Sequence, residues 1–182
     1  ITVRNLPSFV SELGMQLKVP ELGLITVDTA FGGDSFVVVD AATLGFELIA
    51  SEAKKLADLG VAITNLANQQ LSFRHPTNED WKHFSFCLFA GPITREGSHI
   101  TTSHAVAIQP GKIDRSPTGT AVSARMALFF SFIISSSLSQ EIFVQTEEKN
   151  LYRSAVEYSF DEILDNGAYT FALENLGGII KI

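Results

Sequence analysis

Residues 114–134 read DRSPTGTAVSARMALFFSFII, a candidate helix start followed by a long apolar run. Ser116 is a favoured helix N-cap, and Pro117 suits the first helical position because its missing N–H would have no partner there. From Pro117 to about Ile134 the side chains leave almost no polar face, and a helix that is apolar all round is buried all round. The stretch therefore predicts a central helix that runs through the middle of a wrapping sheet.

The flanking sequence supplies strands for that sheet and one further helix. Alternating apolar residues and β-branched residues predict strands near residues 1–5, 15–19, 24–29, 35–40, 84–90, 103–108, 142–147, 151–159, 168–174 and 178–182. An amphipathic helix capped by Ser51 is expected to pack on one side only, through Leu56, Leu59, Ile63 and Leu66. Residues 75–83 and 93–102 are expected to be loops.

Composition and charge limit the possible classes of protein. Of the 182 residues, 46% are hydrophobic and 18% are charged, which is typical of a globular domain with a substantial core. The 13 Lys and Arg against 20 Asp and Glu give a net charge of −7 without a basic cluster. We therefore expect no nucleic-acid partner and no anionic membrane surface as a partner. The longest apolar run, residues 126–134, is too short to span a bilayer.

The single cysteine, Cys87, lies in the strand-like run FSFCLFAG. We expect it to be a small buried core residue rather than a reactive thiol. One cysteine excludes an internal disulfide framework and fits a reducing compartment, and no signal-peptide pattern is present. These features predict a cytoplasmic location.

The start of the central helix is the candidate binding site. The amides of Thr118, Gly119 and Thr120, aided by the helix dipole, are suited to a carboxylate or phosphate, and Asp114 one turn upstream is suited to a cationic amine. An anion site next to a cation site has the recognition logic of an amino acid. In the alternative interpretation, Ser116 and an ordered water satisfy the amides and Asp114 only caps a turn.

Other kinds of site have weaker signals. Neither a G-x-x-x-x-G-K-S/T nor a G-x-G-x-x-G pattern occurs, so a phosphate-binding loop is disfavoured. The four histidines, His75, His83, His99 and His104, lack metal-ligand spacing, so each is expected to be a loop or edge residue and no metal site is expected.

The motif DRSPTGTAVSARMAL resembles the second active-site motif of the proline racemase family, usually written DRSPCGTGTSARMAL. The segments VRNLPSF, VDTAFGGDSFVVVDAATLG, LFAGPITREGSH and GAYTFALENLGGIIKI resemble family segments in the family's order. The resemblance covers nearly the whole chain, and residues 129–158 diverge most. The family includes proline racemases, 4-hydroxyproline epimerases and trans-3-hydroxy-L-proline dehydratases.

The resemblance implies an α/β (α+β) fold like that of diaminopimelate epimerase, in which a curled, mostly antiparallel sheet wraps a central helix. Such enzymes have two similar domains with the active site between them. Residues 1–182 match the second domain only, because the first domain's motif, a cysteine followed by GHGT, is absent and Cys87 does not match its context. The chain begins at Ile1 in strand-like sequence, so we expect it to be part of a longer polypeptide whose first domain is its partner.

The resemblance also assigns roles at the helix start. Asp114 would contact the substrate nitrogen, the Gly119 and Thr120 amides its carboxylate, and Thr118 would take the place of the racemase cysteine. Inversion at Cα needs a group on each face, and a threonine hydroxyl is a far weaker acid or base than a thiol with a pKa of about 8.5. Threonine is the pattern of trans-3-hydroxy-L-proline dehydratases, which need no cofactor or metal.

Two rival functions remain open. The chain can belong to a proline racemase or 4-hydroxyproline epimerase that has accepted threonine, or it can be a non-catalytic amino-acid-binding domain. In each case the expected partner is a small molecule of the proline or hydroxyproline type. The face that meets the first domain is expected to carry apolar surface and to favour self-association, so a homo-oligomer is also expected. Arg125, in an apolar helix, is expected to be a paired structural residue.

Overall fold

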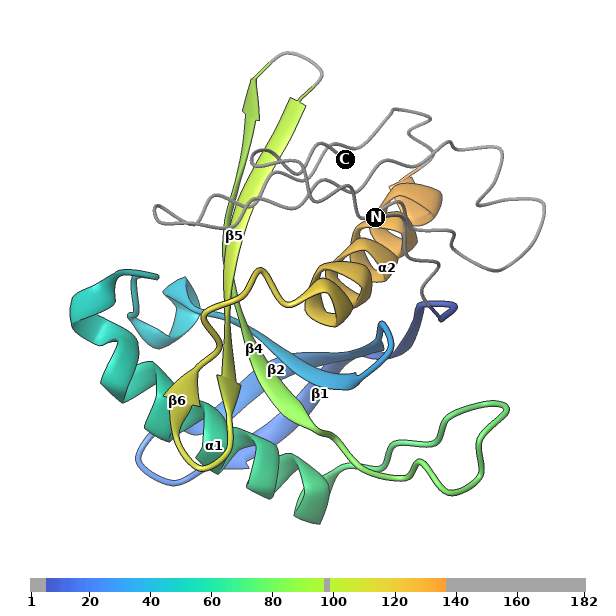
Figure 1. Ribbon diagram of the computed structural model, residues 1–182, viewed down its shortest axis with the longest axis horizontal. Coiled ribbons are helices and arrows are strands. Elements are labelled where there is room, and N and C mark those ends of the chain that lie inside the picture. Colours follow the sequence, from blue (N-terminus) through green and yellow to red (C-terminus); the bar gives the residue numbers. More distant parts are fainter. Residues whose placement is uncertain (1–5, 97–98, 137–182) are drawn as a thin grey trace.

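The computed structural model describes residues 6–96 and 99–136 as one mixed α/β unit (Figure 1). Two helices flank a sheet of six strands, and two short 3-10 turns precede the first helix. The strands are β1 (Phe9–Val19), β2 (Gly23–Phe31), β3 (Ser35–Asp40), β4 (Phe86–Glu96), β5 (His99–Ile108) and β6 (Lys112–Ile113). The helices are α1 (Ala53–Gln70) and α2 (Gly119–Ser136), and the 3-10 turns are η1 (Ala42–Leu44) and η2 (Ala50–Glu52).

The sheet is mostly antiparallel, as expected, and it is open rather than closed. Its strands lie in the order β1-β2-β3-β4-β5-β6, so each strand pairs with its neighbour in sequence. Only β3 and β4 pair in parallel, with Phe36 opposite Phe86 and Asp40 opposite Ala90. This parallel pair is joined by a crossover that contains α1, as parallel strands require.

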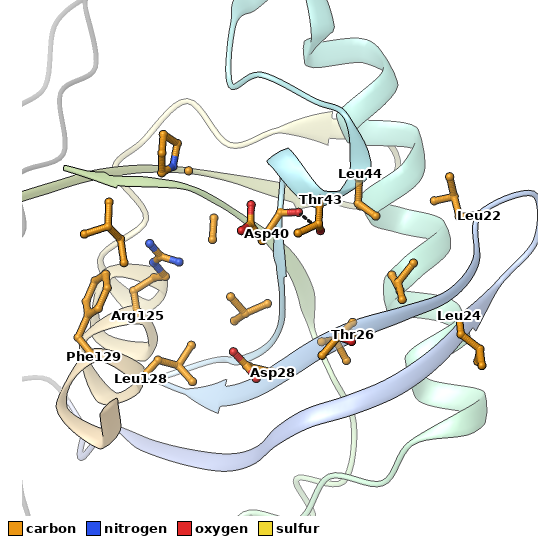
Figure 2. A pocket seen from close by; sticks show the side chains of 17 residues that line it. Leu22, Leu24, Thr26, Asp28, Asp40, Thr43, Leu44, Arg125, Leu128 and Phe129 are labelled. Atoms are coloured by element: carbon orange, nitrogen blue, oxygen red, sulfur yellow. Dashed lines mark hydrogen bonds between the residues drawn. The ribbon is translucent and has the colours of Figure 1, made fainter. Parts of the chain in front are cut away.

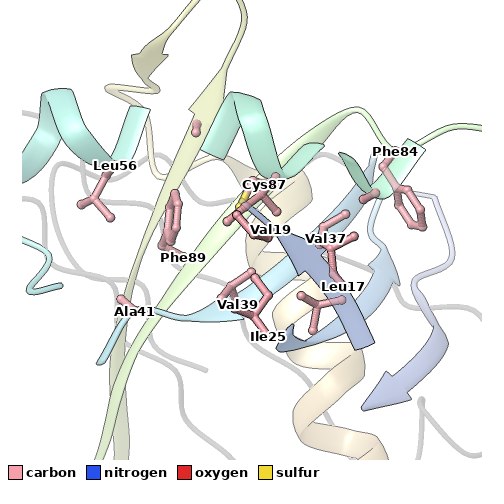
Figure 3. Close-up of a cluster of buried hydrophobic side chains, with 14 of the residues drawn as sticks. Leu17, Val19, Ile25, Val37, Val39, Ala41, Leu56, Phe84, Cys87 and Phe89 are labelled. Atoms are coloured by element: carbon pink, nitrogen blue, oxygen red, sulfur yellow. The ribbon is translucent and has the colours of Figure 1, made fainter. Parts of the chain in front are cut away.

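One face of the sheet packs against α1, and Figure 3 shows part of this core. Gly60 on α1 permits the close approach, because a Cβ there would lie 2.2 Å from the Ala107 side chain on β5. The polar face of α1 is solvent-exposed at Lys54, Lys55 and Asp58. Cys87 is fully buried in this core, which confirms the expectation for it. The cluster consists of Leu17, Val19, Ile25, Val27, Phe31, Val37, Val39, Ala41, Leu56, Ile63, Ala67, Phe73, Phe84, Cys87, Phe89 and Ala107.

The other face of the sheet carries α2, whose residues 121–129 are all buried. This confirms the prediction from its all-apolar sequence. The β2–β3 turn approaches α2 so closely that a Cβ on Gly32 would lie 2.1 Å from the Thr120 carbonyl oxygen. The buried residues of this second cluster are Ala30, Phe36, Val38, Leu88, Ala90, Val106, Ala121, Ala124 and Leu128.

Several predicted boundaries were wrong. Helix α1 begins at Ala53 with Glu52 as N-cap and no side-chain cap, because Ser51 is taken into the preceding 3-10 turn. Residues 93–96 and 99–102 are not a loop: Ile93 pairs with Thr102 and Thr94 with Thr101, since these β-branched residues extend β4 and β5. The expected loop at residues 75–83 is present. The strands predicted at 1–5 and beyond residue 140 lie outside the described residues.

Neither helix of the described residues is long and apolar enough to cross a membrane.

Candidate functional site at the start of helix α2

The candidate site is built on the connection from β6 to α2. Strand β6 pairs with β5 through Ile113 opposite Ala107, and the amide of Asp114 then donates to the Val106 carbonyl at 2.9 Å. Asp114 is therefore fixed at the end of the sheet. The chain then turns through residues 115–118 before α2 begins.

The Asp114 carboxylate organises this turn. Its Oδ1 accepts from the Ser116 amide at 3.0 Å, and its Oδ2 accepts from the hydroxyls of Ser116 at 2.8 Å and Thr118 at 2.7 Å. Partial burial alone would raise the pKa of Asp114, but these hydrogen bonds outweigh burial and hold the pKa below its ordinary value. Asp114 is therefore a carboxylate at neutral pH, and it retains lone-pair capacity for a further donor.

Thr118, rather than Ser116, is the N-cap of α2. Its carbonyl accepts the first helical hydrogen bonds, from the amides of Ala121 at 2.8 Å and Val122 at 3.0 Å. The expectation that Pro117 opens the helix was wrong: Ser116 Oγ accepts from the Thr118 amide at 3.1 Å, as a cap would, but Thr118 is not in a helical conformation and α2 begins only at Gly119. Thr118 has φ of +48°, a left-handed conformation that is unusual for a β-branched residue.

The first amides of α2 have the properties of an anion site. Gly119 and Thr120 open the helix and are partly exposed, and their amides have no hydrogen-bond acceptor among the described residues. Helix N-termini carry a partial positive charge on such amides. The turn therefore places a carboxylate, Asp114, within a few residues of unsatisfied donors.

His104 on β5 is a neighbour of this turn that sequence reasoning missed. Its Nε2 lies 3.1 Å from the Pro117 carbonyl oxygen, and its Nδ1 is shielded from solvent without a partner in the described part of the chain. Burial, with the positive charge of Arg125 second, lowers the pKa of His104 to about 4, so its imidazole is neutral at pH 7. No motif marks this contact, since it joins residues that are brought together only by the fold.

A cavity of about 590 Å³ adjoins the turn. Asp114, Ser116 and Thr118 line its polar end with His104, whereas Gly119 and Thr120 do not line it. The remaining wall is largely apolar and comes from the segment before η2, from η2 and α1, and from the sheet: Leu48, Ile49, Ala50, Ala53, Leu56, Ala105, Val106 and Ile113. A small molecule with an apolar ring and a polar edge fits such a lining.

Arg125 lies in a different cavity, of about 710 Å³, between α2 and the sheet (Figure 2). Its Nη2 donates to the Thr102 hydroxyl at 2.9 Å, and its guanidinium carbon lies 4.9 Å from the centre of the Phe129 ring. Burial lowers the pKa of Arg125 to about 10, while the charges of Asp40 and Asp28 oppose this change. Arg125 thus remains charged and is held through its Nη2 and the Phe129 ring, while its buried Nε has no hydrogen-bond partner among the described residues.

Two other kinds of site have no support in the described residues. Within 6–96 and 99–136 there is no group of three or more His, Cys, Asp or Glu side chains arranged to hold a metal ion. Cys87 is inaccessible, and burial raises the pKa of its thiol far above the ordinary value.

Comparison with known proteins identifies similar folds and the family of the chain. Two solved structures are similar, each at 20% identity over 98% of this chain: a hydroxyproline epimerase from Agrobacterium vitis with bound trans-4-hydroxy-L-proline (TM-score 0.67) and a probable proline racemase from Agrobacterium radiobacter K84 with bound carbonate (TM-score 0.68). The chain spans about half the length of each, 51% and 52%. Residues 1–131 match the family model for proline racemase. The chain therefore belongs to the proline racemase family.

Proposed function

We propose that residues 1–182 are the second domain of a cofactor-independent trans-3-hydroxy-L-proline dehydratase. In this proposal the start of α2 binds the amino acid, and a first domain supplies the base that removes the Cα proton. Thr118 is the group of this domain that faces the ring. The proposal includes a cytoplasmic location and no metal.

The observation that carries the proposal is the state of the Thr118 hydroxyl. It donates its proton to Asp114 Oδ2 at 2.7 Å, and the pKa of Asp114 lies below its ordinary value. A hydroxyl in this setting is a poor proton donor to carbon, whereas inversion at Cα requires a second group that delivers a proton to the opposite face. Elimination of water requires only one base at Cα, so threonine favours elimination.

Substrate recognition follows from the charges at the turn. Asp114 is suited to the ring ammonium, because it is ionised and has lone pairs to spare. The amides of Gly119 and Thr120 are suited to the substrate carboxylate. These contacts would hold Cα near Thr118, with the apolar wall of the adjoining cavity beside the ring.

The reaction is an elimination that balances without an added reagent. The base of the first domain takes the Cα proton, the C–O bond at C3 breaks, and the departing hydroxide takes up the proton that the base removed and leaves as water, which restores the base. The resulting C2=C3 enamine moves a proton from nitrogen to C3 and becomes Δ1-pyrroline-2-carboxylate. No electron is gained or lost overall, so no redox partner is required.

A second candidate is an isomerase of the same family. The similar structure with bound trans-4-hydroxy-L-proline is a hydroxyproline epimerase, so an epimerase pocket is compatible with this fold. In this case the second proton donor would have to be a group other than a thiol at position 118. A third candidate, a non-catalytic amino-acid-binding domain, would use the same turn without the chemistry.

Product analysis separates these candidates. The polypeptide that carries both domains is incubated with trans-3-hydroxy-L-proline, with trans-4-hydroxy-L-proline and with L-proline, and products are followed by NMR and chiral chromatography. Δ1-Pyrroline-2-carboxylate from the 3-hydroxy substrate alone supports the dehydratase. Inverted 4-hydroxyproline or D-proline at comparable rates would show an isomerase. Tight binding by residues 1–182 without turnover in the complete polypeptide would show a binding domain.

A further inference from the structure

His104 and Ser116 hold the two ends of the peptide group that precedes Thr118. On the carbonyl side, His104 Nε2 lies 3.1 Å from the Pro117 oxygen. On the amide side, the Thr118 N–H donates to Ser116 Oγ at 3.1 Å. A carbonyl oxygen only accepts, so His104 must carry its proton on Nε2, and Nδ1 is then unprotonated.

The orientation of this peptide group decides the conformation of Thr118. Rotating it would exchange the positions of the Pro117 oxygen and the Thr118 N–H, and would change φ of Thr118. With φ of +48°, Thr118 lies in a region that costs an L-residue free energy, so the observed orientation needs external support. Released from its contacts, Thr118 would relax toward negative φ.

The side chain of Thr118 depends on the same orientation. Its hydroxyl meets Asp114 Oδ2 at 2.7 Å, and its carbonyl begins the hydrogen bonding of α2. Both contacts are made from the left-handed conformation. Support for the Pro117–Thr118 peptide therefore also sets where the Thr118 hydroxyl lies and where the first helical amides are directed.

We propose that His104 is a positioning residue, which holds the Pro117 carbonyl and thereby keeps Thr118 in its left-handed conformation beside Asp114. His104 lines the same cavity as Thr118, but its Nε2 meets the Pro117 oxygen, whereas the Thr118 hydroxyl is bound to Asp114. It therefore acts through the backbone rather than on a reacting atom. The kinetic consequence rests on the proposed function, whereas the conformational consequence does not.

The neutral state of His104 supports this role. Its surroundings include Arg125 and Asp114, whose charges act on it in opposite directions, and burial favours the uncharged ring. A neutral imidazole with one proton matches a site that offers one acceptor. A second proton, on Nδ1, would have no acceptor among the described residues.

The test compares His104→Leu, which removes the donor, with His104→Gln, whose side-chain amide can place an N–H near the position of Nε2. His83→Leu is the control, because His83 is exposed and stacks on Trp81 away from this turn. The first readout is NMR of residues 1–182: the NOE between the amide proton and Hα of Thr118 is strong only at positive φ. We expect His104→Leu to weaken it, and His104→Gln and the control to keep it.

The second readout is dehydration by the two-domain polypeptide. His104→Leu should lower kcat about tenfold, the kinetic equivalent of one hydrogen bond, with little change in KM, and His104→Gln should restore most of the rate. A weakened NOE with an unchanged rate would overturn the role of Thr118 in the proposed function but leave the positioning role standing. An unchanged NOE in a folded His104→Leu variant would overturn the positioning role itself.

A measurement on the unmodified chain covers the case in which the leucine variant does not fold. The ¹⁵N chemical shifts of His104 at neutral pH report which ring nitrogen is protonated. We expect a neutral ring with the proton on Nε2. A proton on Nδ1 alone, or a charged ring at neutral pH, would overturn the inference.

Discussion

Replacing Thr118 by valine or by glycine separates the two free-energy contributions at the start of α2. Valine keeps the β-branched shape at φ of +48° but removes the hydroxyl that donates to Asp114. A hydrogen bond to a charged group contributes about 1.5–3 kcal/mol when buried and less at a partly exposed site. We expect Thr118→Val to lower the free energy of unfolding by about 1–1.5 kcal/mol.

Thr118→Gly loses the same hydrogen bond but removes the cost of the left-handed conformation. That cost is about 1–2 kcal/mol for an L-residue, against about 0.5–1 kcal/mol of additional chain entropy lost by glycine on folding. The glycine variant should therefore be more stable than the valine variant by about 0.5–1 kcal/mol. This order is the reverse of the one expected in a strand.

Urea unfolding of residues 1–182, followed by circular dichroism, measures both variants. Thr26 provides a matched control, because it lies exposed on β2 and its hydroxyl accepts from Gln16 at 3.0 Å. At position 26 valine should be the more stable replacement, since strands favour β-branched residues. If valine is also at least as stable as glycine at position 118, the left-handed conformation is not a source of strain there.

Four further outcomes are expected. In the two-domain polypeptide, Thr118→Cys should form D-proline from L-proline, because a helix N-terminus favours the thiolate. In heavy water the D-proline should carry deuterium at Cα. No D-proline above the wild-type level would refute the role of this position. The folded-state pKa of His104, about 4, lies below its unfolded value of about 6.5, so the unfolded state binds more protons between these values. Stability should therefore fall by about 3 kcal/mol as pH drops from about 6.5 to about 4, and His104→Gln should remove this contribution in denaturant titrations. In urea unfolding, Gly32→Ala should lower the free energy of unfolding by about 2–3 kcal/mol, because the added Cβ clashes with α2. Gly14→Ala should lower it by about 1 kcal/mol, because a Cβ there meets nothing within 4 Å and only the positive φ opposes alanine. Because burial raises the pKa of the Cys87 thiol, a thiol reagent should label it only after unfolding, and labelling of the native chain at the unfolded rate would contradict its burial.

The central helix was predictable because its sequence alone determines that it must be buried. The run from Ala121 to Phe129 has no polar side that could face water, and the structure buries every residue of it. The start of the helix was displaced by two residues, because local preference puts Ser116 and Pro117 in the first turn. The contacts of the turn decide otherwise: Ser116 binds Asp114 within the turn, and the Pro117 carbonyl binds His104 on another strand.

The candidate site was predictable only in its sequence-local part. Asp114 and Thr118 lie four residues apart, so a motif can name both, and the structure joins them by a hydrogen bond. His104 lies on another strand and has no spacing that marks it, so it could be recognised only once β5 and the turn were seen together. The inner parts of β4 and β5 were predicted as strands at 84–90 and 103–108, whereas their outer parts within 93–102 were predicted as a loop, since Gly97 and nearby polar residues obscure the β-branched pattern on either side.

Among the described strands, the one parallel pairing, of β3 with β4, divides the sheet into two halves. Strands β1, β2 and β3 are joined by residues 20–22 and 32–34, and β4, β5 and β6 by residues 97–98 and 109–111, so each half can form from local contacts. The two halves meet only where β3 lies beside β4, across the long connection of residues 41–85. Closing that connection costs more loop entropy than closing any other connection between the described strands. The folding rate should therefore be limited by the joining of the two halves rather than by the formation of either half.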